Sequence, residues 1–462
     1  MRRRNLLGLG ALGIFPLSPI MASTVDRWDD GVDVLIAGAG AAGLSAAVTA
    51  AEQGASVLIA EKMPMIGGDT LISGGKYNAV DPKRQKPQGI EDSVEYFTEQ
   101  ILASGAGRNS RKIAETLARE STVTLEWLEE LGLQFMPTVS EVFGSGFPRS
   151  HTPVLPRGTG YICVLSEAAL RQKVRILTNS PVLSFITDST GRAVGAKIQT
   201  KQSVVNVEAR MGVVVASGGF GASQHMREVY TPEVAELPFD SHPGATGELL
   251  IAAERVGAKL VNMEFAECVP GAAAEFSYQI RLDYVPSRVI IINSKGQRFV
   301  DETAGRRAIA EAVLKEMKEG PCFSIASDET LSQFDHITQK NIYRGLFAGQ
   351  AWKAMTAKDL GEKLGISGRV LAEEIHRAAD ERGLSKPPYW ATRLFLRVHH
   401  TLGGVDIDCN ARVLGIDGEP IPGLYAAGAV TGSVHGAERM GGNGLPSACA
   451  FGRIAGANVT KL

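Results

Sequence analysis

The chain has 462 residues, of which 44% are hydrophobic and 21% are charged, and its net charge at pH 7 is −2. A chain of this size and composition can bury a large core and is expected to form two domains. Nucleic acid is excluded as a partner, since binding to phosphates requires a concentrated Lys/Arg surface and the sequence has none.

The first 22 residues have the character of an export signal. Consecutive arginines at Arg2 to Arg4 precede an apolar stretch from Leu6 to Ile14, which is too short to span a bilayer. This arrangement is typical of the twin-arginine route, which exports folded protein. Residues 1–22 are therefore predicted to be a twin-arginine-type signal that leads to the periplasm. Because Ile20 makes the cleavage site a poor one, an uncleaved anchor is the alternative.

Residues 32–61 carry the pattern of a strand, a glycine turn, a helix and a second strand. An apolar strand runs into Gly38, Gly40 and Gly43, which form G-x-G-x-x-G. Such glycines allow a tight turn, close approach of backbone N–H groups to a pyrophosphate, and packing of the helix on the strand. Glu61 ends the second strand, where an acid commonly meets the ribose. We predict an adenine-dinucleotide site here; a glycine turn that binds nothing is the alternative.

Further segments along the chain are assigned to the same cofactor-binding unit. Glycine-rich loops at 66–70 and 73–75 are expected to lie against a flat cofactor, because glycine allows close backbone approach. Residues 90–132 are predicted to be amphipathic helices. A hairpin-like pair of strands at 194–198 and 204–209 precedes an apolar strand, 212–216, that ends on Gly218 and Gly219.

The nucleotide-binding pattern covers residues 30–263 and returns at residues 400–462. Between them, residues 264–399 are richer in aromatic and charged side chains and contain helices with polar faces. We predict an α/β fold in which a discontinuous Rossmann-like domain carries an inserted second domain. The five cysteines form no CxxC or CxxCH motif, so neither a metal site nor covalently bound c-type haem is expected in the chain.

Four stretches together resemble the soluble fumarate reductase and flavocytochrome c flavoprotein family, within it the urocanate- and acrylate-reductase-like branch. They are the glycine fingerprint with EKMPMIGGDT, ASGGFGAS with HPGATGE, GQRFVDETAGR, and HHTLGG through VHGAERMGGNG. The resemblance implies FAD as the cofactor, an α+β capping domain over the flavin, and reduction of a carbon–carbon double bond next to a carboxylate. No histidine for covalent flavin attachment stands near Asp69, so the FAD is expected to be non-covalent.

The resemblance also implies the catalytic residues. Arg306 matches the arginine that donates a proton, and His400 and Arg439 match the pair that grips the substrate carboxylate. Because a guanidinium is a weak acid, Arg306 requires a second group in contact with it, and Asp283 is the candidate. The positions expected to contact the cofactor are Gly38, Gly40, Ala41, Ala42, Gly43, Glu61, Lys62, Gly67, Gly68, Asp69, Thr70, Ser73, Gly74, Gly75, Gly218, Gly219, Gly428, Gly444 and Leu445.

Two positions depart from the family pattern. Fumarate reductases place a histidine before a proline for the second carboxylate, whereas this chain has Val269 before Pro270. A valine would leave that charge buried without a partner, so a monocarboxylate such as a substituted acrylate is expected rather than fumarate. The second departure is Ala429, which replaces a glutamate that contacts the ribityl chain of the cofactor.

The resulting hypothesis is an exported FAD-dependent ene-reductase for an acrylate-type acid, which receives electrons from a separate periplasmic c-type cytochrome. Three alternatives remain open: a fumarate reductase proper, a flavin-dependent desaturase that runs in the reverse direction on an acid or a ketosteroid-like substrate, and a flavin electron carrier without turnover. His151, in the sequence RSHT, is equally compatible with a structural and a functional role.

Overall fold

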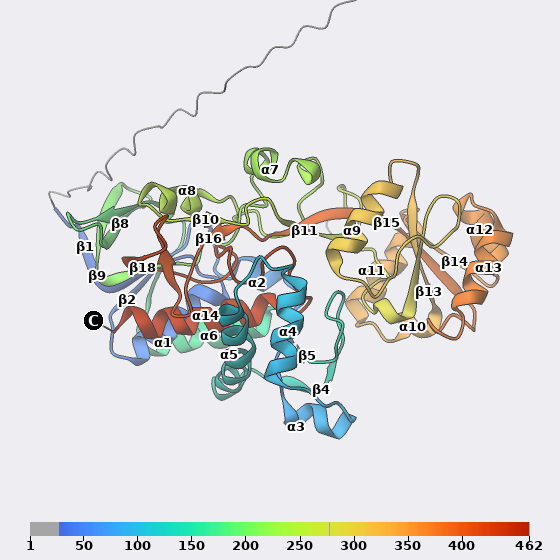
Figure 1. Ribbon diagram of the computed structural model, residues 1–462, viewed down its shortest axis with the longest axis horizontal. Helices are drawn as coiled ribbons and strands as arrows, with labels where there is room; N and C mark the ends of the chain where they lie inside the picture. Colours follow the sequence, from blue (N-terminus) through green and yellow to red (C-terminus); the bar gives the residue numbers. More distant parts are fainter. Residues whose placement is uncertain (1–26, 277, 462) are drawn as a thin grey trace, which may run out of the picture.

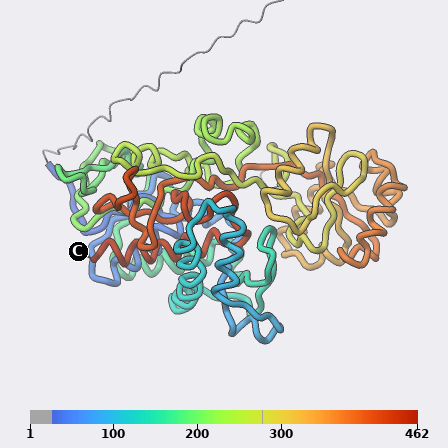
Figure 2. Tube along the Cα trace, viewed as in Figure 1, coloured from blue at the N-terminus to red at the C-terminus, as the bar shows by residue number. Residues whose placement is uncertain are grey.

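The computed structural model describes residues 27–276 and 278–461 and shows two lobes joined by a pair of strands (Figure 1 and Figure 2). The predicted export signal lies outside these residues. Within the described residues, no helix is long and apolar enough to cross a bilayer.

The first lobe is built on a sheet in the order β17-β18-β9-β1-β2-β6, with the hairpin β7-β8 attached to β9. Strands β18, β9, β1, β2 and β6 are parallel neighbours, and β17 is antiparallel to β18. All of β2 and the last four residues of β1 and of β9 are buried, which explains their continuous runs of Val, Ile, Leu and Ala. The strands are β1 (Asp30–Ala37), β2 (Val57–Ala60), β6 (Arg175–Leu177), β7 (Val182–Thr187), β8 (Ala193–Gln199), β9 (Val204–Val215), β17 (Arg412–Leu414) and β18 (Pro420–Ala426). This is the predicted α/β architecture.

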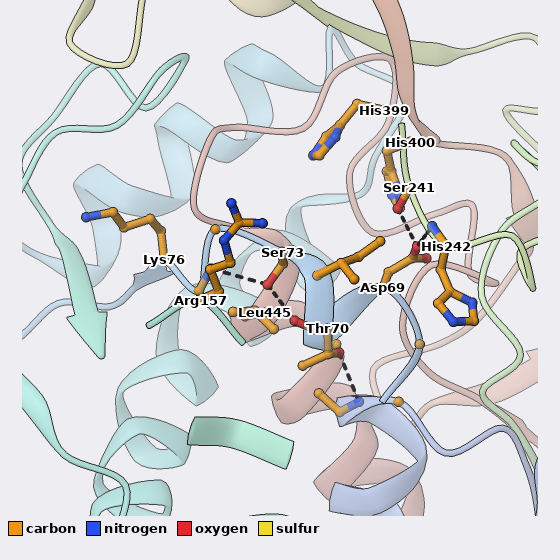
Figure 3. A pocket seen from close by; sticks show the side chains of 18 of the residues that line it. Asp69, Thr70, Ser73, Lys76, Arg157, Ser241, His242, His399, His400 and Leu445 are labelled. Atoms are coloured by element: carbon orange, nitrogen blue, oxygen red, sulfur yellow. Dashed lines mark hydrogen bonds between the residues drawn. The ribbon is translucent and has the colours of Figure 1, made fainter. Parts of the chain in front are cut away.

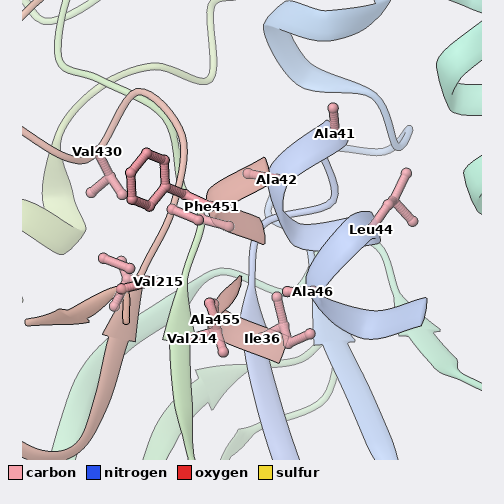
Figure 4. Close-up of a cluster of buried hydrophobic side chains, with 14 of the residues drawn as sticks. Ile36, Ala41, Ala42, Leu44, Ala46, Val214, Val215, Val430, Phe451 and Ala455 are labelled. Carbon is pink, nitrogen blue, oxygen red and sulfur yellow. The ribbon is translucent and has the colours of Figure 1, made fainter. Parts of the chain in front are cut away.

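The last helix of the chain, α14 (Gly444–Val459), packs against the first, α1 (Ala41–Glu52), beside the central strands (Figure 4). Their backbones lie close: a Cβ on Gly452 would stand 2.4 Å from the carbonyl oxygen of Ala42, and one on Gly456 would stand 2.3 Å from that of Ala46. The return of the chain at its C-terminal end therefore completes the core around the glycine turn.

The remaining elements of this lobe surround the sheet. The predicted amphipathic segment 90–132 forms two helices, α4 and α5. Short strands β3, β5 and β4 make a separate small sheet. These elements are α2 (Gly68–Ile72), β3 (Tyr77–Asn78), α3 (Pro82–Gln85), α4 (Val94–Ser104), α5 (Arg111–Glu130), β4 (Phe135–Ser140), β5 (Ser150–Pro153), α6 (Thr159–Arg171), α7 (Gln224–Tyr230), α8 (Glu248–Arg255), β10 (Leu260–Val261) and β16 (Gly404–Val405).

One strand differs from its prediction. The segments 204–209 and 212–216 were expected to be separate strands, but β9 is continuous from Val204 to Val215. Its first part pairs antiparallel with β8, and from Val207 it also pairs parallel with β1. A bulge opposite Val32 and Val34 absorbs the polar interruption, so the strand continues through it.

The second lobe contains a mostly antiparallel sheet, β11-β15-β13-β12 with β14 beside β15, and helices with hydrophobic cores of their own. Its long strand β15 reaches back into the first lobe, where the Thr401 hydroxyl accepts a hydrogen bond from the Phe220 N–H at 3.0 Å. The boundary expected at residues 399 and 400 thus falls inside one strand. The elements are β11 (Ala266–Gly271), β12 (Val289–Ile292), α9 (Arg306–Glu316), β13 (Cys322–Ser327), α10 (Asp328–Ser332), α11 (His336–Phe347), β14 (Ala351–Ala354), α12 (Ala357–Leu364), α13 (Gly368–Ala378) and β15 (Tyr389–Thr401).

Candidate active site

A cavity of about 1980 Å³ extends from the glycine turn of the first lobe to the inner wall of the second (Figure 3). Pockets for a single drug-sized ligand are typically about 300–1,000 Å³. The cavity therefore has room for a dinucleotide and a small substrate together.

The glycine turn forms one end of this cavity. Gly38 follows β1 with φ at +111°, and a Cβ there would stand 2.3 Å from the carbonyl oxygen of Ala216. A Cβ on Gly43 would stand 2.0 Å from the carbonyl oxygen of Gly38, so the helix can approach the turn only with glycine at this position. Helix α1 begins at Ala41, and Gly40 before it has no side chain to cap the helix; the Ala41 N–H donates to the Thr70 hydroxyl at 3.1 Å. The start of the helix lies at the cavity, where its dipole and the N–H groups that follow favour a phosphate.

Acidic side chains hold the loops around the turn. Glu61, at the end of β2, accepts hydrogen bonds from the backbone N–H groups of Ala39 and Met63, both at 2.8 Å. Asp69 accepts one from the backbone N–H of His242 at 2.7 Å and another from the Ser241 hydroxyl. Both carboxylates also line the cavity, so they are fixed in place before any ligand binds.

Most positions expected to contact the cofactor line the cavity, namely Gly38, Gly40, Ala41, Ala42, Glu61, Lys62, Gly68, Asp69, Thr70, Ser73, Gly74, Gly75, Gly218, Gly428, Gly444 and Leu445. Gly43, Gly67 and Gly219 lie behind this lining. A Cβ on Gly67 would stand 2.9 Å from the Leu71 side chain, and one on Gly219 would stand 2.4 Å from the Thr401 hydroxyl. These glycines therefore permit the packing of the wall rather than face the cavity.

The far end of the cavity contains two buried arginines that share one carboxylate. Arg306, the first residue of α9, donates through Nε and Nη2 to the carbonyl oxygen of Phe143, at 2.9 and 2.8 Å. Its Nη1 donates to Oε1 of Glu267, and Nη2 of Arg439 donates to the same oxygen at 3.2 Å. Burial raises the pKa of the Glu267 carboxyl, but the two guanidinium groups outweigh burial and hold it well below its ordinary value.

Arg439 lines the cavity and has unused donors. Its side chain is 8% exposed; Nη2 donates to Glu267, whereas neither Nη1 nor the fully covered Nε donates to any of the described residues. A buried guanidinium with unpaired N–H groups fits a carboxylate ligand, which can accept two parallel bonds. Arg439 is thus arranged to bind an anion that enters the cavity.

Two histidines beside Arg439 are neutral. Burial, together with the charge of Arg439, lowers the pKa of His400 well below its ordinary value and that of His435 to about 3. His435 forms a hydrogen bond with the Ser447 hydroxyl at 3.1 Å, and His400 lies opposite Glu267 in the pairing of β15 with β11. Both imidazoles line the cavity and can offer an N–H group but no charge.

The expected contact between Asp283 and Arg306 is wrong. Asp283 is fully buried and pairs with Arg281, whose Nε donates to Oδ1 at 2.9 Å. Among the described residues, Glu267 is the carboxylate in contact with Arg306. The sequence offered no local signal for this contact, because Glu267 is 39 residues from Arg306 and 172 residues from Arg439 along the chain.

Apolar and aromatic side chains form part of the cavity wall, with Arg281 and Arg397 among them. Val269 is 4% exposed and lines the cavity, as do the side chains of Phe276, Tyr278, Tyr284 and Phe334. The structure thus places a hydrophobic group at the position where the sequence departs from the fumarate reductase pattern. His151 lies outside this wall: it is fully buried and hydrogen-bonded to the Tyr77 carbonyl at 3.0 Å and Asp81 at 3.1 Å, which is a structural role.

A Rossmann-like turn, an acid at the end of the second strand and a cavity that continues to a buried arginine pair define a dinucleotide-dependent oxidoreductase. The FAD binding domain family matches residues 33–445, and the chain belongs to this family, as the sequence predicted. FAD is its cofactor. The N-terminus of α1, which lies at the cavity, fits the pyrophosphate, and Glu61 fits the ribose. Gly74, whose Cβ would meet nothing within 4 Å, leaves room for the ring system.

The relatives are reductases of unsaturated acids. The chain is 33% identical to a urocanate reductase of Eggerthella lenta, over 93% of this chain and 75% of that one. It is 31% identical to a probable fumarate reductase of Shewanella frigidimarina (strain NCIMB 400), over 97% and 81% respectively. The flavoprotein reductases of this family act on the C=C bonds of unsaturated carboxylates.

A solved structure from a different branch is also similar. It is the 3-ketosteroid-Δ4-(5α)-dehydrogenase of Rhodococcus jostii RHA1 in complex with 4-androstene-3,17-dione, with a TM-score of 0.79 and 27% identity. The similarity covers 96% of this chain and 99% of that one. The fold alone therefore leaves the direction of the reaction and the substrate open, and these depend on the side chains of the site.

Proposed function

We propose that the protein is an FAD-dependent reductase of the C=C bond of an α,β-unsaturated monocarboxylate of the acrylate type. The observation that carries the proposal is the buried arginine pair at the end of the cavity, in which Arg439 uses only Nη2 for Glu267. Val269 supports the choice of a monocarboxylate, because its side chain offers no hydrogen bond to a second carboxylate.

In this mechanism Arg439 holds the substrate carboxylate with a bidentate fork, and the neutral His400 adds an N–H donor. These bonds draw electron density toward the carboxylate and make the β-carbon electrophilic. The chemistry that bound, reduced FAD supplies is a hydride for that carbon. Arg306 then protonates the α-carbon, so that one hydride and one proton saturate the bond. Arg306 is thereby left as a neutral guanidine, a strong base, and regains its proton from solvent by way of Glu267, the carboxylate that touches it.

Export and electron supply belong to the same proposal. We propose that residues 1–22 direct the protein to the periplasm and that a separate c-type cytochrome donates the electrons. The arginines before the apolar stretch support the first part, and the lack of a CxxCH motif in the sequence supports the second.

The first experiment measures oxidation of reduced methyl viologen by the purified, FAD-loaded protein with fumarate, methacrylate, cinnamate and urocanate. We expect turnover with the substituted acrylates and little with fumarate. Fumarate as the best substrate would contradict the monocarboxylate assignment, and no turnover with any of the four would contradict the reductase.

Arg306→Ala tests the assignment of the proton donor. It is expected to lose activity by about 10³-fold while FAD stays bound, in line with the loss of a positioned acid. Arg307→Ala serves as the matched control. Arg307 is the exposed neighbour of Arg306, and it pairs with Glu311 on the surface of the helix. Activity of Arg306→Ala close to that of the control would refute the role of Arg306.

A second candidate function is the reverse reaction, desaturation of a saturated acid or ketone. The aromatic wall of the cavity favours it, since a bulky apolar substrate would pack there. Rates with a reduced dye as donor and an oxidised dye as acceptor separate the two directions. A pure electron carrier is disfavoured, because it needs no buried anion clamp.

A further inference from the structure

Glu267 places a carboxylate of the protein inside a site that binds a carboxylate of the substrate. Its side chain is 1% exposed, and one oxygen, Oε1, accepts hydrogen bonds from both Arg306 and Arg439. The other oxygen, Oε2, is buried without a hydrogen-bond partner among the described residues. One donor of each arginine is therefore occupied before any ligand arrives.

We propose that Glu267 is the internal counter-ion of the arginine pair and limits the substrate to a single negative charge. The inference rests on the proposed function and gives it a second, independent determinant of substrate class beside Val269. The negative charge of Glu267 would make the site select unsaturated monoanions over dianions. This selection would add to the effect of Val269, which offers no hydrogen bond to a second carboxylate.

The charges around the pair leave room for one anion. Arg306 and Arg439 carry two positive charges, and Glu267 cancels one of them. His400 and His435 line the same end and are neutral. A monocarboxylate therefore neutralises the arginine pair, whereas a dicarboxylate brings a further buried negative charge close to that of Glu267, which is unfavourable.

The other cations that line the cavity have partners of their own or lie away from Arg439. Arg281 is paired with Asp283 at 2.9 Å, and His399 is paired with Asp240 at 3.0 Å. Lys62 is paired with Glu248 at 3.0 Å, and the Nη groups of Arg397 donate to the carbonyl oxygens of Ala272, Ala273 and Phe239. Lys76 and Arg157 lie across the cavity from His399 and His400 (Figure 3). A second carboxylate on a small substrate held by Arg439 would thus come close to the negative charge of Glu267.

The test compares fumarate with monomethyl fumarate, which has nearly the same shape and one charge fewer. Dissociation constants come from the change in flavin absorbance when each ligand is added to the oxidised holoenzyme. We expect the wild type to bind the monoester more tightly. Glu267→Gln should shift the ratio toward fumarate by about tenfold or more, since two like charges a few ångströms apart interact strongly at an effective dielectric constant near 20.

The control variant is Glu264→Gln, an exposed glutamate just before β11 that lies 3.8 Å from Arg108 and outside the cavity lining. The ratio of its dissociation constants for fumarate and monomethyl fumarate should match that of the wild type. An unchanged ratio in a folded, FAD-loaded Glu267→Gln would overturn the proposal. If that variant loses its FAD, the wild-type ratio decides, because tighter binding of fumarate would contradict the charge limit. This test measures ligand binding and not turnover. If the protein bound the ligands but turned none of them over, that result would contradict the proposed reductase activity and leave the limit on substrate charge standing.

Discussion

His400 and His435 are buried next to Arg439, and this position makes their ionisation costly. The folded protein holds the pKa of His435 at about 3 and lowers that of His400, while an unfolded chain has the ordinary value near 6.5. Between these values the unfolded state takes up protons that the folded state does not. Folded-state stability is therefore full above pH 6.5 and falls as the pH drops below it.

The pH dependence of unfolding tests this burial. From pH 7.5 to pH 5, one such histidine is expected to lower the free energy of unfolding by about 2 kcal/mol. In urea unfolding, His435→Gln should lose this part of the pH dependence of the free energy of unfolding. His225 lies on the exposed face of α7, so His225→Gln should retain it. Carboxylates titrate mainly below this window, so they do not hide the effect. Parallel slopes for both variants would show that His435 ionises freely.

The residues of the site also show which contacts a sequence can reveal. Arg306, His400 and Arg439 were placed by their motifs, and the structure brings them to the same cavity. The acidic partner of Arg306 was predicted wrongly, since Asp283 pairs with Arg281, two residues away. Glu267 meets its arginines only because β11 and α9 pack together and the C-terminal return passes beside them. Such a contact depends on tertiary structure, and no local pattern records it.

At the scale of elements, the turn between β1 and α1 separates two uses of glycine. Gly43 lies against the carbonyl oxygen of Gly38, where a Cβ would be 2.0 Å away. Gly40 lines the cavity, and a Cβ there would meet nothing nearer than 3.8 Å. Gly43 is therefore required by the fold, whereas Gly40 leaves space for the ligand.

Two alanine variants should therefore behave differently. Gly43→Ala is expected to lower the thermal stability of the FAD-free protein, because α1 must move away from the turn. Gly40→Ala should leave the apo-protein nearly as stable as the wild type and weaken FAD binding by tenfold or more, about 1.4 kcal/mol. Differential scanning calorimetry and FAD titration measure the two effects. Equal destabilisation of both apo-proteins would contradict this division.

Helices and strands were predicted correctly where the apolar residues recur with a regular period. The prediction failed where contacts with a neighbouring strand determine the extent of an element. The strand, turn and helix around Gly38 follow from local pattern, and α4 and α5 follow from apolar spacing. The continuity of β9 could not be predicted in this way, because the strand passes Arg210 by a bulge of its own, opposite Val32 and Val34 of β1. The crossing of β15 from one lobe to the other likewise depends on its partners in both.

At the scale of the whole molecule, the outer part of the second lobe has a hydrophobic core of its own, while a smaller cluster with Phe143 and Ile309 joins the two lobes. The large core of the first lobe includes Ile36, Val214 and Phe451, while the outer part of the second lobe packs around residues such as Leu371 and Ile375. None of these second-lobe side chains lines the cavity. Their stability should therefore not depend on the cofactor.

Hydrogen exchange with and without FAD tests this independence. Removal of FAD is expected to increase exchange at the start of α1 and in the return segment 428–444 by tenfold or more, since both line the cavity. Amides of β12, α12 and α13 should exchange at the same rate in both forms. Loss of protection throughout the second lobe would show that the lobes unfold together.

The way Arg306 is held has a consequence for the timing of the reaction. Arg306 belongs to α9 of the second lobe, yet it donates to the carbonyl of Phe143 in the first; Arg439 belongs to the return segment, and Glu267 lies on the connecting strand between them. The acid, the anion clamp and their shared carboxylate thus come together only where both lobes meet. If the lobes were apart, the acid and the anion clamp would be separated, and the enzyme could not pass its reducing equivalents to a substrate.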